Sequence, residues 1–299
     1  MTSLFRTRWF GVAVLIAVTA LVAVTAISFL TARELVAHRG AYVSALTPAD
    51  SGMRYQTVPL RAADGTLLEG WWIPPSDGAR RPDLAVVVLA HAEDGAWTRL
   101  SSPGGRPVSG KARMLEYATW LHREGFIVLA FDFRSYGGSE GFVTSGGYLE
   151  QQDLAAAVRL AHERALKAPV AVLGDRMGAT VALAVAAKDS SIVAVVADSP
   201  GTTWMEGIAR VDSVGRGKLA WGWLAIPAFV QLVAERELLK GRHFASGAPT
   251  AANAIARGAV VLIPRIVTTG SGPEPTAFIQ GVMDSLFLRG ILRGVKGSH

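Results

Sequence analysis

Residues 168–188, APVAVLGDRMGATVALAVAAK, hold two glycines four positions apart between an apolar run and an alanine-rich stretch. Gly174 and Gly178 have the spacing of the Gly-x-Ser-x-Gly turn, in which a serine between a strand and a helix attacks a carbonyl carbon. The middle residue here is Arg176. A guanidinium stays protonated and offers no usable lone pair, so it forms no acyl intermediate. The pattern therefore predicts the backbone of a nucleophile turn without its nucleophile.

The elements that must position this turn alternate between strand and helix patterns. Strands are predicted at 84–90, 126–131, 170–174, 192–197 and 259–267, and helices at 111–122, 150–166, 177–188 and about 276–289. Ala63-Asp64-Gly65 between YQTVPL and TLLEGWWI predicts a hairpin ahead of them. Alternation of this kind with continuously apolar strands predicts a parallel sheet covered by helices on both faces.

Several motifs, in order along the chain, resemble the α/β-hydrolase superfamily, and within it the membrane-anchored, serine-aminopeptidase-like bacterial branch. The similarity covers about residues 55–200, from LRAADGTLLEGWWIPP through VVVLAHAEDG, FIVLAFDFRSYGGSEG and VAVLGDRMGATVALAVAA to AVVADSP. Ser135 stands where the resembling Asp-x-Arg-Gly turn has its first glycine. The resemblance implies an α/β-hydrolase fold, with a mostly parallel sheet of about eight strands and a pocket at the carboxyl ends of those strands.

The resemblance places the oxyanion loop of such an enzyme at HAEDG, residues 91–95, and implies the backbone N–H groups of Glu93 and Met177 as donors. Two carboxylates beside that position would oppose a developing negative charge. We therefore expect Arg176 to pair with Glu93 or Asp94 across the former oxyanion pocket.

The acid and the base of a hydrolase also depart from the resembling pattern. Pro273 aligns with the expected aspartate, Glu274 follows one position late, and Asp198 at a strand end is the alternative acid. His299 stands about where the base would fall. Both nucleophile and acid positions therefore lack the side chain that acyl transfer needs.

No catalytic role is expected for the other polar residues of these motifs and helices. Asp132 and Arg134 of the resembling turn are expected to hold loops together. Asp175 is expected to be a surface or loop carboxylate, because the turn directs only its central side chain at the pocket. His122 and His162, on predicted helices, are expected to face water. No metal spacing or phosphate-binding loop occurs, so neither a metal nor a cofactor is predicted.

The first thirty residues predict a membrane anchor. Residues 9–30 carry no charge, and as a helix they span about 33 Å against a hydrocarbon core of roughly 30 Å. The arginines of residues 1–8 favour the cytoplasm, so the domain after the anchor is expected outside the cytoplasm, and residues 9–30 are expected to contact membrane lipid. A cleaved signal remains the alternative, since Val24-Thr25-Ala26 has the small residues of a cleavage site.

The remaining chain divides into a linker, residues 31–54, and a hydrolase-like domain, residues 55–299. Residues 203–245 interrupt the strand–helix alternation, and LAWGWLAIPAFVQLV within them predicts a lid or cap insertion. The absence of cysteine excludes disulfides and a thiol nucleophile. The formal charge of +6 is scattered along the chain, which does not favour nucleic acid and is compatible with anionic lipid.

Three interpretations of function remain. The favoured one is a pseudoenzyme that keeps the hydrolase scaffold to bind a small acyl or lipid ligand or a protein partner. The alternative is an active esterase-like or peptidase-like serine hydrolase with relocated residues, for example Ser135 or Ser213 as nucleophile. The third is a purely structural membrane subunit.

Overall fold

The computed structural model describes residues 2–36, 47–77, 85–92, 109–141, 144–166, 168–198, 200–201 and 260–262. The chain divides into two compact units, so the amino-terminal helix α1 and the α/β domain are described separately.

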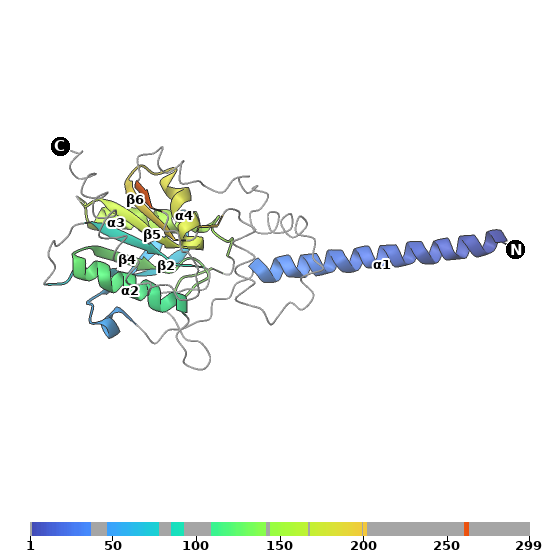
Figure 1. Ribbon diagram of the computed structural model, residues 1–299, viewed down its shortest axis with the longest axis horizontal. Helices are drawn as coiled ribbons and strands as arrows, with labels where there is room; N and C mark the ends of the chain where they lie inside the picture. Colours follow the sequence, from blue (N-terminus) through green and yellow to red (C-terminus); the bar gives the residue numbers. More distant parts are fainter. Residues whose placement is uncertain are drawn as a thin grey trace, which may run out of the picture. The chain divides into compact units, whose positions relative to one another are not determined.

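The α/β domain is built on one sheet (Figure 1), in which the described residues supply seven strands in the order β1-β2-β4-β3-β5-β6-β7. The strands are β1 (Gln56–Arg61), β2 (Leu67–Ile73), β3 (Val86–Ala90), β4 (Ile127–Phe131), β5 (Val170–Asp175), β6 (Ile192–Asp198) and β7 (Val260–Leu262). β2 pairs antiparallel with both β1 and β4, and every other pairing is parallel. The predicted hairpin and α/β-hydrolase fold are confirmed. Of the strand predicted at 259–267 the structure describes three residues, and the helix predicted at about 276–289 lies outside the described residues.

Three helices cover the two faces of the sheet. They are α2 (Ser109–Glu124), α3 (Glu150–Arg164) and α4 (Met177–Ala186), and a short 3-10 helix, η1 (Pro48–Ser51), precedes β1. Figure 1 shows α2 on one face and α3 with α4 on the other. Each face of the sheet has its own hydrophobic core, and successive side chains of β3 point alternately into the two cores. Val86 and Val88 pack in the core beneath α3 and α4, and Val87 and Leu89 pack in the core beneath α2. This double burial explains why the predicted strands are continuously apolar.

Helix α1 runs over Thr2–Val36, so it continues beyond the predicted span. Its segment Trp9–Leu30 is long and apolar enough to cross a membrane, and no other described helix is. Large apolar side chains of this segment are solvent-exposed, among them Trp9, Phe10 and Leu15. A helix that is apolar on all sides and exposed needs an apolar environment around it.

Candidate functional site

A single residue joins β5 to α4. Arg176 follows the last residue of β5, precedes the first of α4, and has φ 47° and ψ −102°. Side chains other than glycine rarely adopt this conformation, because the β-carbon crowds the backbone. The backbone N–H of Arg176 donates to the carbonyl of Asp198 at 2.8 Å, and its carbonyl accepts from the N–H of Thr180 at 3.0 Å. Both bonds fix the strained residue in place.

The two glycines of the turn are required by packing. A β-carbon on Gly174 would lie 2.4 Å from the carbonyl oxygen of Gly178, and one on Gly178 would lie 2.1 Å from the carbonyl oxygen of Ala90. Because these neighbours are backbone atoms, they cannot move aside without shifting α4 or β3. The glycine spacing is therefore explained by the close crossing of α4 over β5 and β3, whichever side chain stands between the glycines.

The Arg176 side chain is 28% exposed, and its Nε lies 3.9 Å from Oδ1 of Asp175, whose side chain is 3% exposed. The prediction that Asp175 is a surface carboxylate is wrong. Asp175 pairs in register with Asp198, the last residue of β6, so both stand at the buried carboxyl edge of the sheet. An ion contact of this length with a partly exposed guanidinium contributes little. The predicted partners Glu93 and Asp94 lie outside the described residues.

His91, directly after β3, has a structural role. Its Nε2 accepts a hydrogen bond from the N–H of Phe133 at 3.1 Å, so its proton is on Nδ1, which donates to the carbonyl of Ala92 at 2.6 Å. The ring also packs edge-on against Phe133 and Tyr136. Since both nitrogens are committed to the backbone, this buried imidazole is not available as a general base.

The other predicted catalytic groups are only partly within the described residues. Met177 is the first residue of α4 and is buried. Asp198 is also buried, and its carbonyl oxygen holds the turn at Arg176. Glu93, Glu274 and His299 lie outside the described residues. The acid, base and oxyanion roles therefore stay predictions.

The turn after β4 is held by a buried cation, as predicted. Arg134 donates to Asp153 of α3 from its Nε, its Nη2 and its backbone N–H at 2.7–3.1 Å, and from Nη1 to Asp64 of the hairpin turn at 2.7 Å. Asp132 accepts from the N–H of Gly138 at 3.1 Å. Three segments far apart in the sequence are thus joined at one guanidinium.

Burial and pairing act against each other within this ion pair. Burial raises the pKa of the Asp153 carboxyl to about 6, although hydrogen bonds and charge from Arg134 oppose the rise. Burial lowers the pKa of Arg134, but bonds to Asp153 and Asp64 outweigh burial and raise it. The two pKa values rise for different reasons. Burial dominates for Asp153, whose side chain is fully buried, whereas pairing dominates for Arg134, which keeps 6% of its side chain exposed and has a second carboxylate partner.

The loop before α3 closes around a buried carboxylate and touches the turn helix. Glu150 accepts from Thr144 Oγ1, from the N–H and Oγ of Ser145 and from the N–H of Gly147, all within 3.0 Å. A β-carbon on Gly147, which has φ 117°, would meet Val181 of α4 at 3.2 Å. This loop therefore packs directly against the first turns of α4.

Ser135, a predicted alternative nucleophile, does not have an accessible hydroxyl. It is 4% exposed, has φ 65°, and its Oγ has no hydrogen-bond partner among the residues that the structure describes. A nucleophile needs both a base and access for its substrate. The second alternative, Ser213, lies outside the described residues.

The two helix histidines do not simply face water, so that prediction is wrong. Both are partly buried and bonded: His122 Nδ1 lies 2.6 Å from the carbonyl oxygen of Pro74, and His162 Nε2 lies 3.0 Å from Oγ of Ser191. The periodicity of a single helix gives no sign of these partners, because they come from segments distant in the sequence. Among the described residues no group of three or more His, Asp or Glu side chains is placed to hold a metal ion.

The strand order and the β5–α4 turn are those of an α/β hydrolase, and sequence comparison agrees with the fold. Residues 64–257 match the X-Pro dipeptidyl-peptidase (S15) family, and the chain belongs to this family.

Curated relatives include the uncharacterised protein YfhR of Escherichia coli, 28% identical over 48% of this chain and 46% of YfhR. An uncharacterised protein of Mycobacterium tuberculosis is 30% identical over 50% of this chain and 47% of its own length. The chain thus spans about half the length of the curated relatives that it matches.

Two solved structures are examples of the proteins to which this chain is similar. An esterase of Pyrococcus furiosus is 29% identical, with a TM-score of 0.47 over 66% of this chain and 70% of the esterase. The α/β hydrolase GrgF of a Penicillium species is 18% identical, with a TM-score of 0.48 over 80% of this chain and 98% of GrgF.

Proposed function

We propose that this protein is a membrane-anchored, non-catalytic member of its hydrolase family, a pseudoenzyme that uses the scaffold to bind a ligand or partner. The observation that carries the proposal is Arg176 at the strained position between β5 and α4, where acyl transfer requires a nucleophile. The packing of Gly174 and Gly178 accounts for the turn's persistence without catalysis.

Two further observations support the proposal. The buried hydroxyl of Ser135 has neither a base nor access to substrate. His91, the described histidine at the carboxyl edge, has both nitrogens bonded to backbone groups. The occupant that we propose is a small acyl or lipid ligand or a protein partner, and the exposed apolar segment of α1 supports contact with membrane lipid.

Catalysis is tested on the full-length protein in detergent micelles with a fluorophosphonate probe and short-chain aryl esters. We expect no labelling and no turnover above that of Arg176→Ala. Robust labelling would overturn the proposal, and peptide mapping of the labelled residue would identify the relocated nucleophile.

The loss of the acid is tested separately with Arg176→Ser. Because a serine without an oriented base is a poor nucleophile, we expect this variant to gain little activity. Efficient ester hydrolysis by Arg176→Ser would show that an acid and a base are still in place, and that only the nucleophile has been exchanged.

Membrane anchoring is tested by alkaline extraction of membranes from cells expressing the full chain. We expect the protein to stay in the membrane pellet, and a variant lacking residues 2–30 to move to the soluble fraction. Release of the full chain by alkaline buffer would contradict the proposed anchor.

A further inference from the structure

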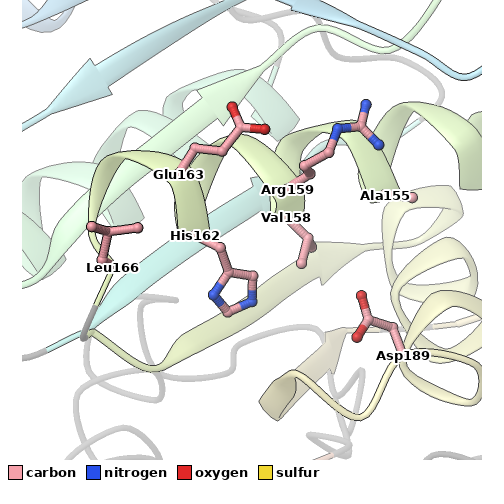
Figure 2. A pocket seen from close by; sticks show the side chains of 7 residues that line it. All are labelled: Ala155, Val158, Arg159, His162, Glu163, Leu166 and Asp189. Atoms are coloured by element: carbon pink, nitrogen blue, oxygen red, sulfur yellow. The ribbon is translucent and has the colours of Figure 1, made fainter.

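A hollow lies between α3 and the turn that connects α4 to β6, away from the Arg176 turn. Its volume is about 480 Å³, and its lining residues are Ala155, Val158, Arg159, His162, Glu163, Leu166 and Asp189. Six of them belong to α3 or follow it directly, at positions that recur along one side of a helix. Asp189 faces them from the connecting turn (Figure 2). Most of the exposed surface of the lining is apolar, although four of the seven residues end in a polar or charged group.

One residue positions the two polar groups that face each other across the hollow. The Oγ of Ser191 lies 3.0 Å from Nε2 of His162, and the N–H of Ser191 donates to Oδ1 of Asp189 at 2.9 Å. Figure 2 shows the Asp189 carboxylate turned toward the His162 ring, with Val158 between them. The hydrogen bonds to Ser191 therefore fix the positions of the His162 imidazole and the Asp189 carboxylate relative to each other. Binding sites commonly orient their polar groups through such supporting hydrogen bonds.

The carboxylate in this hollow has no ion-pair partner in the part of the chain that the structure describes. Among the described residues no Lys, Arg or His nitrogen lies within 4.0 Å of the Asp189 carboxylate. The neighbouring cations are committed elsewhere: Lys188 donates to Gln151 Oε1 at 2.8 Å, and Arg159 Nη2 to the carbonyl of Arg61 at 2.9 Å. Arg159 and Glu163 also line the hollow, and Figure 2 shows their charged ends pointing away from Asp189.

We infer that this hollow binds a primary ammonium group carried on an aliphatic stem. The ammonium has three donors, and it pairs with the fixed carboxylate of Asp189. The stem lies along Ala155, Val158 and Leu166, where it removes apolar surface from water; Leu166 alone is 85% exposed. The site is separate from the Arg176 turn and does not depend on whether the protein is catalytic.

The test uses the full-length protein in detergent micelles and ligand-observed NMR titrations with pentylammonium and with its neutral isostere, pentanol. We expect saturable binding of pentylammonium with an affinity at least about tenfold above that of pentanol. A peptide with a single lysine, acetyl-Gly-Lys-Gly-amide, distinguishes a lysine side chain from a free amine by its relative affinity. Absence of saturable binding by both amines would overturn the inference, as would equal affinity for pentanol.

Asp189→Asn is the matched variant, because its amide oxygen still accepts from the Ser191 N–H while the charge is removed. We expect it to weaken pentylammonium binding about tenfold or more. Glu116→Gln removes an exposed carboxylate from α2, which lies on the other face of the sheet and does not line the hollow, and its affinity should stay within about twofold of the wild type. Equal losses in both variants would indicate a general surface-charge effect and would overturn the assignment to Asp189. If Asp189→Asn does not fold, the comparison of pentylammonium with pentanol still decides the inference.

Discussion

Replacing Arg176 by glycine is expected to stabilise the protein. The residue is held at φ 47° and ψ −102°, and a side chain other than glycine in such a region costs about 1–3 kcal/mol. The greater freedom of glycine in the unfolded chain offsets about 0.5–1 kcal/mol of that gain. Loss of the 3.9 Å contact with Asp175 costs about 0–1 kcal/mol, because the arginine is partly exposed. The expected net stabilisation by Arg176→Gly is therefore about 1 kcal/mol.

Arg176→Ala is the matched control for this prediction. Alanine keeps the β-carbon, and with it the strain, but removes the guanidinium, so this variant should be equal to the wild type or slightly less stable. The difference between the glycine and alanine variants therefore isolates the backbone strain, and we expect it to be about 1–2 kcal/mol.

The assay is urea unfolding of the full-length protein in detergent micelles, followed by tryptophan fluorescence, with the slope compared among the three proteins. Equal slopes with midpoints in the order glycine above wild type, and wild type at or above alanine, would support the reasoning. A glycine variant no more stable than the alanine variant would refute it, because position 176 would then store no strain.

Three further predictions concern the turn after β4 and the packing of α4 on the sheet. Ser135→Gly should raise stability by about 1–2 kcal/mol in the same urea assay, because it removes a β-carbon at φ 65° and a buried hydroxyl without a partner; a lower midpoint would contradict this. Gly178→Ala should lower stability by about 3 kcal/mol or more, since its β-carbon would meet Ala90 O at 2.1 Å; a loss below about 1 kcal/mol would show that α4 shifts freely. Asp153 has a folded-state pKa of about 6, above the unfolded value of about 3.9, so the folded state retains a proton that the unfolded state releases between them. The stability of the wild type relative to Asp153→Asn should therefore fall as pH rises from about 4 to about 6, and a pH-independent difference would be the contrary result.

Much of the fold follows from local patterns. The strands predicted at 126–131, 170–174 and 192–197 agree with β4, β5 and β6 to within a residue at either end. These runs are short, continuously apolar and bounded by turn residues, so their type is decided before any tertiary contact is considered.

The polar residues were harder to predict, because their surroundings come from distant segments. Asp175 is buried at the carboxyl edge of the sheet, where it lies in register with Asp198 of the neighbouring strand β6. Arg134 gathers Asp64 and Asp153 from two other elements, and Ser191 reaches His162 on α3. Sequence spacing does not indicate the contacts of Arg134 or that of Ser191, because each contact joins elements that the order of strands in the sheet brings together.

The sequence by itself determined the chemistry at the turn: a cation instead of a hydroxyl at residue 176, between two glycines, after an apolar strand and before an alanine-rich helix. Only the tertiary structure decided that this cation stands on a strained backbone beside the buried Asp175. Side-chain chemistry is a property of a single residue, whereas strain and burial are imposed by the backbone atoms of β3, β5 and β6 that close around it.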